Sequence, residues 1–259
     1  MKKFTKLTAF ALALVMALGL LAGCGGSNSD NSTPSGDDTA KTKLVVATSP
    51  DFPPFESLEG GEVVGIEVDI LNKIAEKMGM ELDIQQMDFD SVIPGVQAGK
   101  FDVGMSGITV TDKRKENVDF SSVYFMAAQA IVVTDGSSIT GKADLEGKKV
   151  SVQTGTTAEE YCMGNGYEVL AFTANNDAAA ALTSGKVDAW VVDNEVALAM
   201  APELGLTVLD EAMTSEPYAF AFQKGSELVA PFNEALDALL ADGTVEKIFQ
   251  QYGVTYIAP

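Results

Sequence analysis

The sequence predicts an α/β fold in which strands of a parallel sheet alternate with helices. Three observations predict it: short apolar runs of strand length, amphipathic segments of helix length between them, and glycines where those helices should end. Short apolar runs are typical of strands buried on both faces, and their alternation with helices is typical of parallel sheets. Ligands of such folds bind beyond the carboxyl ends of the strands, so the site should lie there.

The first half of the chain supplies three strand–helix units. In the first helix, Ile66, Ile70 and Ile74 fall on one face. The expected elements are strand 44–48, helix 66–78 with Gly79 as C-cap, strand 82–87, a short helix capped by Asp90 and ended by Gly99, strand 103–106 and a helical turn at 111–114.

The second half repeats the pattern. The expected elements are strand 149–153, a helix from Thr157, strand 168–173, an alanine-rich helix at 175–184, strand 189–193, a helix capped by Asp193, and an amphipathic helix at 226–241 followed by Gly243.

Composition excludes several function classes. The chain has 259 residues, 17 Lys+Arg against 37 Asp+Glu, a formal charge of -20 and no histidine. Nucleic acid is a poor partner for such a charge, since phosphate binding needs a cationic surface. Without histidine there is no Ser-His-Asp triad, and with only two cysteines there is no zinc site of four thiolates. We expect neither a metal nor a cofactor.

The N-terminal residues resemble a bacterial lipoprotein signal. Lysines at positions 2, 3 and 6 precede an apolar stretch at 7–21, which ends in the lipobox-like tetrapeptide Leu-Ala-Gly-Cys. The stretch is short for a membrane-spanning anchor, the alternative interpretation. We expect residues 1–23 to be removed and Cys24 to be lipidated. Cys162 is then the only other thiol, and we expect it to be buried and inert.

A flexible tether should follow the lipidated cysteine. Residues 24–43 contain no large apolar side chain that could be buried, as is typical of linkers. Removal of residues 1–23 takes away three lysines and no acid, so the formal charge falls from -20 to -23. We therefore expect residues 44–259 outside the cell, lipid-anchored to the outer face of the bacterial cytoplasmic membrane.

The strand end after Ser106 leads to Arg114, the only arginine of the chain. Lysine suffices for solvation everywhere else, so this position favours a planar fork that binds a carboxylate or phosphate. The alternative is a surface arginine paired with Asp112 or Glu116.

The strand ends after Gln153 and Val192 carry complementary groups. Thr156 and Thr157 begin a helix whose free N–H groups favour an anion, although threonines there are often ordinary caps. Asp193 either accepts from an ammonium group or simply caps the next helix.

Aromatic residues follow the other strand ends. Phe52 lies in a Pro-rich loop after Thr48, and Phe89 follows the strand at 82–87. Exposing such rings is costly, so they either pack inward or wall a pocket. A carboxylate clamp, an ammonium acceptor and apolar walls together indicate a site for a free α-amino acid.

Ten segments in this order resemble family 3 extracellular solute-binding proteins, the polar amino acid receptors of ABC importers. They are 48–56, 65–70, 88–94, 107–114, 118–121, 145–150, 153–157, 187–193, 216–218 and 241–244. The resemblance covers essentially all of residues 44–259. It implies the type II periplasmic-binding-protein-like fold: two lobes with parallel-type sheets and helices on both faces, two crossing strands, and the ligand in the cleft between the lobes. Lobe 1 would comprise residues 44–126 plus 220–259, and lobe 2 residues 127–219.

The resemblance also assigns roles at the site. Arg114 would hold the ligand carboxylate, with Thr109 and the amides of Thr156 and Thr157. Asp193 and the Gly107 carbonyl would accept from the ammonium, and Phe52 and Phe89 would sandwich the side chain. The full expected set of ligand-binding residues is Ser49, Phe52, Phe89, Ser106, Gly107, Thr109, Arg114, Gln153, Thr156, Thr157 and Asp193.

The resemblance implies a monomeric binding protein without catalysis, whose partners are an amino acid and a membrane permease. Ser49 stands where several receptors for cationic amino acids carry an aspartate, and Gln153 where some relatives carry a lysine. A polar neutral amino acid is therefore the expected ligand, although Asp51, Glu56 or Glu67 could supply the missing acid. The alternative function is a cyclohexadienyl-dehydratase-like enzyme on the same fold, with Glu67 or Asp193 as proton donor.

Overall fold

The computed structural model describes residues 42–259, which lie within one compact unit of residues 39–259. The predicted signal peptide, the lipidation site Cys24 and nearly all of the predicted tether lie outside the described residues. Within residues 42–259, no helix combines the length and the apolar character that crossing a membrane requires.

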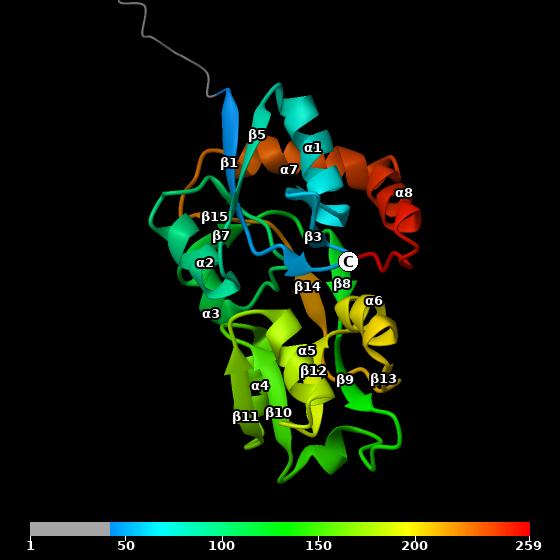
Figure 1. The fold of residues 1–259 in the computed structure, drawn as a ribbon. Helices are drawn as coiled ribbons and strands as arrows, with labels where there is room; N and C mark the ends of the chain where they lie inside the picture. Colours follow the sequence, from blue (N-terminus) through cyan, green and yellow to red (C-terminus); the bar gives the residue numbers. More distant parts are fainter. Residues whose placement is uncertain (1–41) are drawn as a thin grey trace, which may run out of the picture. The chain divides into compact units, whose positions relative to one another are not determined.

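The first lobe is built on a five-stranded sheet with the order β5-β1-β6-β15-β7 (Figure 1). Its strands are β1 (Lys43–Thr48), β5 (Glu81–Gln86), β6 (Val103–Gly104), β7 (Val118–Phe120) and β15 (Ala221–Gln223). β1 is parallel to both β5 and β6, whereas β15 is antiparallel to β6 and β7. The sheet therefore has the predicted parallel centre, extended by antiparallel strands that the sequence did not predict.

Helices cover both faces of this sheet. The helices of the lobe are α1 (Ile66–Met78), α2 (Phe89–Gln97), α3 (Asp112–Lys115), α7 (Val229–Ala241) and α8 (Thr244–Gln251). Leu44 and Val46 of β1 belong to the core that includes α1, while Ala47 belongs to the core that includes α2. This alternation follows from the two-residue period of a strand, which sends successive side chains to opposite faces.

A small three-stranded sheet joins β1 to α1. It consists of β2 (Asp51–Phe52), β3 (Glu56–Glu59) and β4 (Glu62–Val64), which pair antiparallel in sequence order. Gly65 closes it at φ 138°, where a Cβ would lie 2.2 Å from the Phe55 carbonyl oxygen, so only glycine fits. The turn back into α1 keeps β2 at the carboxyl end of β1, which places Phe52 and Asp51 there.

The second lobe contains a sheet with the order β11-β10-β12-β9-β13. Its strands are β9 (Gln129–Thr134), β10 (Lys149–Gln153), β11 (Glu168–Phe172), β12 (Ala189–Asp193) and β13 (Leu206–Val208); its helices are η1 (Lys142–Leu145), α4 (Thr157–Gly164), α5 (Asn175–Thr183) and α6 (Asn194–Leu204). β10 is parallel to β11 and β12, and β9 is antiparallel to β12. Cys162 of α4 is fully buried in the core of this lobe, and burial raises the pKa of its thiol to about 12.

Two short strands cross between the lobes (Figure 1). β8 (Phe125–Ala127) and β14 (Glu216–Tyr218) pair antiparallel with each other and with no other strand. The Phe125 ring stacks on Phe249 of α8 at 4.5 Å between centroids, and the Met126 N–H donates to the Ile257 carbonyl at 3.0 Å. The crossing is thus held by the C-terminal segment as well as by its own pairing.

Some predicted boundaries were wrong. The helix expected to be capped by Asp90 begins at Phe89, after Asp88 in an extended conformation, so Asp90 lies in its first turn. There its negative charge favours the helix N-terminus without capping it. The strand expected at 103–106 ends at Gly104 because the chain turns away at Gly107, where φ is 53°.

Candidate functional site

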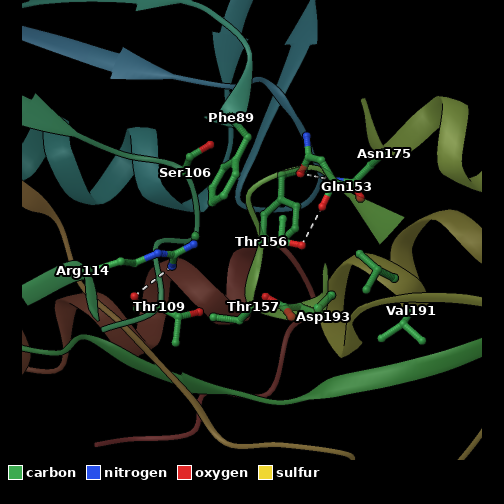
Figure 2. Close-up of a pocket in the computed structure, with 14 residues that line it drawn as sticks. Phe89, Ser106, Thr109, Arg114, Gln153, Thr156, Thr157, Asn175, Val191 and Asp193 are labelled. Carbon is green, nitrogen blue, oxygen red and sulfur yellow. Dashed lines mark hydrogen bonds between the residues drawn. The ribbon is translucent and has the colours of Figure 1, made fainter. Parts of the chain in front are cut away.

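A small cavity lies between the two lobes at the carboxyl ends of β1, β6, β10 and β12 (Figure 2). Its lining residues are Phe52, Phe89, Ser106, Gly107, Thr109, Arg114, Gln153, Thr156, Thr157, Ala158, Asn175, Val191, Val192 and Asp193. Every ligand-binding residue expected from the sequence is among them except Ser49. Four residues of the lining, Ala158, Asn175, Val191 and Val192, were not expected.

Arg114 lies at one side of the cavity and reaches across the cleft. The Thr111 hydroxyl caps the turn that carries it. One guanidinium nitrogen donates to the Thr109 carbonyl at 2.9 Å and the other to the Gly155 carbonyl of the second lobe at 3.1 Å. Its guanidinium lies 5.6 Å from the centroid of the Phe89 ring, a cation–π distance. The alternative of a surface pair does not hold, because within residues 42–259 Arg114 forms no ion pair with Asp112 or Glu116, and Asp112 pairs with Lys115.

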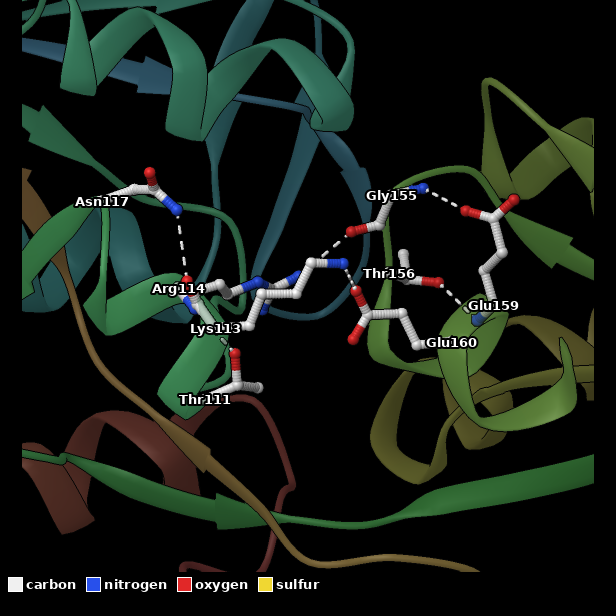
Figure 3. A network of polar contacts seen from close by, with 8 residues as sticks. All are labelled: Thr111, Lys113, Arg114, Asn117, Gly155, Thr156, Glu159 and Glu160. Carbon is white, nitrogen blue, oxygen red and sulfur yellow. Dashed lines mark hydrogen bonds and ion pairs between the residues drawn. The ribbon is translucent and has the colours of Figure 1, made fainter. Parts of the chain in front are cut away.

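A second contact between the lobes lies beside Arg114 (Figure 3). Lys113 forms an ion pair with Glu160 of α4, and both side chains are at least half exposed. The Gly155 N–H is held by Glu159 at 2.7 Å, in the loop that Arg114 contacts. The two lobes therefore meet through consecutive cations of α3 and the start of α4.

The start of α4 lines the cavity beside this contact. The Thr156 hydroxyl accepts from the Glu159 N–H at 3.2 Å and donates to the Gln153 carbonyl at 2.7 Å, so it serves as the helix cap. The Thr157 hydroxyl accepts from Gln129 at 2.9 Å. A capped helix start beside an arginine is suited to an anionic group.

Asp193 is the last residue of β12 and lines the cavity. It occupies the N-cap position of α6, yet its side chain makes no capping bond and instead accepts from the Tyr218 hydroxyl. Burial, reinforced by the nearby Glu216 carboxylate, raises the pKa of Asp193 to about 7. The predicted capping role is therefore wrong for the side chain. This carboxyl is available to the cavity and titrates near neutral pH.

Gly107 lies at a turn that touches the cavity wall. Its φ is 53°, and a Cβ there would lie 2.5 Å from the Phe52 ring. Only glycine therefore allows the ring and the turn to meet. The Gly107 N–H donates to the Glu67 carboxylate at 2.9 Å, which fixes the turn from beneath.

The support beneath Gly107 is a fully buried acidic cluster of Glu56, Glu67, Tyr124 and Ser106. Glu67 also accepts from the Tyr124 hydroxyl, and Glu56 accepts from the Ser106 hydroxyl at 2.8 Å. Burial and the Glu67 carboxylate raise the pKa of Glu56 well above its usual range. Burial therefore favours the protonated form of Glu56. Neither glutamate lines the cavity. Of the two predicted proton donors, Glu67 and Asp193, only Asp193 lies in the lining.

The side of the cavity away from Arg114 is formed by two amides, as Figure 2 shows. Gln153 and Asn175 are both buried, and the Asn175 side-chain amide donates to the Gln153 side-chain oxygen at 2.9 Å. Asn175 was not predicted as a site residue. The signal for it was the strand at 168–172, whose carboxyl end points to the same edge of the sheet as that of Gln153.

Ser49 lies outside the cavity lining. Its hydroxyl donates to Asp51 at 3.0 Å, and its N–H donates to the Ser106 hydroxyl at 3.1 Å. Both partners lie in the first lobe, so Ser49 shapes the loop that carries Asp51.

The charges of the lining match a zwitterion. Only Arg114 and Asp193 carry charged side chains among the lining residues. An arginine fork with helix N–H groups suits a carboxylate, and a buried carboxylate suits an ammonium. The remaining lining is aromatic, aliphatic, hydroxyl or amide. The lining therefore offers charged partners to both groups of a small zwitterion, and it leaves no charged lining group for a further charge on that molecule.

Comparisons with known proteins agree with this geometry. The model of the bacterial extracellular solute-binding proteins, family 3, matches residues 44–255. The arginine-binding extracellular protein ArtP of Bacillus subtilis (strain 168) is 35% identical over 240 residues, which cover 90% of this chain and 92% of that protein.

Solved structures extend the similarity to three dimensions. An ancestral arginine-binding protein, solved with arginine and also with glutamine, is 42% identical and superposes with TM-scores of 0.77 and 0.78, covering 82% of this chain and 98% of that one. An ancestral amino acid-binding protein, described as a precursor of cyclohexadienyl dehydratase, is 35% identical with a TM-score of 0.76, covering 82% of this chain and 95% of that one.

Proposed function

The chain belongs to the bacterial extracellular solute-binding proteins, family 3, and from that premise we propose that it captures a free α-amino acid with a polar neutral side chain and delivers it to the permease of an ABC importer. One observation carries the proposal: the cavity between the lobes has one cationic and one anionic lining residue, Arg114 and Asp193. These two groups match the carboxylate and the ammonium that every free amino acid carries.

Each group of the ligand has a partner in this proposal. Arg114 holds the carboxylate together with Thr109 and the N–H groups of Thr156 and Thr157. Asp193 and the Gly107 carbonyl accept from the ammonium. The rings of Phe52 and Phe89 enclose the side chain, with Ser106 and Gln153 completing the wall.

Closure of the cleft follows from the division of these groups between the lobes. Arg114 belongs to the first lobe, and Thr156, Thr157 and Asp193 to the second, so only the closed form offers all contacts. A ligand that prefers the closed form shifts the population toward it. Moving the closed-to-open ratio from 1:99 to 99:1 requires about 5.5 kcal/mol of preference. The closed lobes then present a joint surface to the permease.

A neutral side chain is favoured by the absence of a further charge in the lining. Arg114 and Asp193 are used by the carboxylate and ammonium, and Gln153 and Asn175 offer amide groups on the opposite side. Among the relatives, ArtP is named for arginine, whereas the ancestral protein was solved with both arginine and glutamine. The amide wall of this chain supports the second kind of ligand.

The place of the protein in the cell forms part of the proposal. Residues 1–23 act as a lipoprotein signal, Cys24 carries the lipid, and residues 24–43 tether a monomer to the outer face of the cytoplasmic membrane. We assign residues 44–126 plus 220–259 to lobe 1 and residues 127–219 to lobe 2. The crossing strands β8 and β14 support this division.

A dehydratase of cyclic carboxylates is the second candidate. The buried Asp193, whose pKa lies at about 7, has the properties of a proton donor at neutral pH. The similarity to a precursor of cyclohexadienyl dehydratase also supports this second candidate, although that precursor is itself described as amino acid-binding. The same cavity would then hold a cyclic acid by its carboxylate.

A thermal-shift screen of the full-length protein separates the two candidates. The protein is unfolded and refolded to remove bound ligand, then tested with the twenty amino acids, dicarboxylates and prephenate-like cyclic acids. Binding at one hundred times Kd stabilises by about 2.7 kcal/mol, which gives a clear shift in Tm. We expect a shift with one or a few neutral amino acids. A response to a cyclic acid alone would support the enzyme.

A further inference from the structure

Asp51 lies directly behind the amide wall of the cavity. Its carboxylate belongs to β2 of the first lobe but accepts from two donors of the second lobe: the Asn175 N–H at 2.7 Å and the Gln153 side-chain nitrogen at 3.2 Å. Gln153 and Asn175 line the cavity, whereas Asp51 does not. A carboxylate therefore lies one side chain away from the ligand.

The Gln153 amide is oriented by its partners so that it shields this carboxylate. Its nitrogen donates to Asp51 and also to the Thr173 carbonyl at 3.1 Å, while its oxygen accepts from Asn175 at 2.9 Å. Both hydrogens of the amide nitrogen are thus directed to acceptors outside the cavity. The nitrogen occupies the position in which a cationic group of a ligand would contact Asp51.

Asp51 is the acid that a cationic ligand could reach. Glu56 and Glu67 are fully buried and directed to Ser106, Gly107 and Tyr124. Asp193 is already matched by the ligand ammonium in the proposed function. With Gln153 in place, no acid remains for a positively charged side chain, and burying one unpaired would be strongly unfavourable.

We propose that Asp51 determines whether the site binds neutral or cationic ligand side chains. Gln153 makes the site selective for neutral side chains because its amide is hydrogen-bonded to the Asp51 carboxylate. This inference rests on the proposed amino acid binding. If the side chain at 153 is shortened, a guanidinium or ammonium of the ligand takes the place of the amide nitrogen. Its charge-assisted hydrogen bonds to Asp51 then favour the cation over a neutral group of the same shape.

The test compares arginine with citrulline, its uncharged isostere, and includes glutamine as the neutral reference. Affinities are measured by calorimetry for the full-length wild type, Gln153→Ala and the double variant Asp51→Asn/Gln153→Ala. The wild type should bind glutamine more tightly than arginine. Gln153→Ala should bind arginine at least tenfold more tightly than citrulline, and the double variant should bind the two within about threefold of each other.

A matched control restores a cation at the same place. Gln153→Lys supplies a tethered ammonium for Asp51 and should again disfavour arginine relative to citrulline. If the Gln153→Ala variants do not fold, Gln153→Lys still tests the inference, because a preference of Gln153→Lys for arginine over citrulline would contradict it.

Several results would overturn the inference. They are equal binding of arginine and citrulline by Gln153→Ala, a preference for arginine that survives in the double variant, and wild-type protein that prefers arginine to every neutral amino acid. The failure of the proposed function has a different signature, since wild type and variants alike would then bind no amino acid at all.

Discussion

Two buried carboxylate–tyrosine pairs flank the crossing strands, and only one of them faces the cavity. Asp193 accepts from Tyr218, and Glu67 accepts from Tyr124. The two tyrosine rings lie 6.3 Å apart between centroids. Asp193 lines the cavity across from Arg114, whereas the Glu67 pair lies beneath Gly107 with Glu56 as its neighbour.

A raised pKa does not by itself identify a ligand-binding group. Burial raises the pKa of Asp193 and that of Glu56. Glu56 accepts from the Ser106 hydroxyl and lies beside Glu67, which holds the turn at Gly107. Asp193 has open space beside it and a cation across the cavity. The cavity, rather than the titration, distinguishes a group that binds from a group that supports.

The largest expected effect on ligand affinity comes from Arg114→Ala. This variant removes the cation that lies across the cavity from Asp193 and has no counterpart beside Glu67. Ligand affinity should fall at least a hundredfold, since a carboxylate left buried without its partner costs about 3–5 kcal/mol. Calorimetry with the amino acid found in the screen measures this loss, and circular dichroism should show an unchanged fold.

Lys113→Ala is the matched control for that variant. Lys113 is the preceding residue and also bridges the lobes, but its side chain is 75% exposed and that of Glu160 50%. Exposed pairs contribute up to about 1 kcal/mol, so affinity should change by at most about fivefold. Equal losses for the two variants would contradict the role of Arg114 as the carboxylate clamp.

The second-largest expected effect is a dependence of ligand affinity on pH. Asp193 produces it, and the Glu67–Tyr124 pair, which lies outside the cavity, does not. The ligand ammonium favours ionised Asp193, whose pKa is about 7 in the empty cavity beside Glu216, Tyr218 and Arg114. Below pH 7 binding must first remove a proton, so affinity should fall about tenfold per pH unit. Calorimetry from pH 8 to pH 5 measures it.

The stability of the unliganded protein should depend on pH in the opposite direction to ligand affinity: the contribution of Asp193 to stability should fall as pH rises. Because the folded pKa lies above the unfolded value, the contribution of this group is fully present below about pH 4 and is lost as pH rises through about 7. Asp193→Asn is the control and should flatten the affinity profile. A wild-type affinity that stays constant between pH 5 and pH 8 would rule out Asp193 as the ammonium acceptor.

The smallest effect separates the two tyrosines. Tyr124→Phe removes a hydrogen bond in the sealed cluster and should lower the free energy of unfolding by about 1–2 kcal/mol with no change in affinity. Tyr218→Phe removes the bond that lowers the pKa of Asp193, so the pH midpoint of binding should move upward. Urea unfolding and calorimetry measure the two quantities. A shifted midpoint in Tyr124→Phe would show that the pairs are not independent.

Much of the cavity could be predicted from local sequence because strand ends position it. The carboxyl ends of parallel strands meet at one edge, so Phe52, Gly107, Gln153 and Asp193 converge there although they are far apart in the chain. Asn175 was not predicted because no site residue was expected after the strand at 168–173. The helix at 66–78 and its glycine cap were predicted to the residue.

Contacts between distant segments could not be predicted from the sequence. Strands of three residues, such as β7, β13 and β15, carry no readable period, so these antiparallel strands were not predicted. The bond of Asp51 to Asn175 spans 124 positions, and that of Tyr124 to Glu67 spans 57. No local pattern records such pairs, because they depend on how the lobes and loops pack.

The inert Cys162 has a practical consequence for measuring closure. Its thiol is fully buried with a pKa of about 12, so at neutral pH it offers almost no thiolate to alkylating reagents. It is the only free cysteine among residues 42–259. In a chain without Cys24, single cysteines introduced on the surface of each lobe can therefore accept maleimide dyes selectively, and energy transfer between the dyes would report cleft motion without replacement of Cys162.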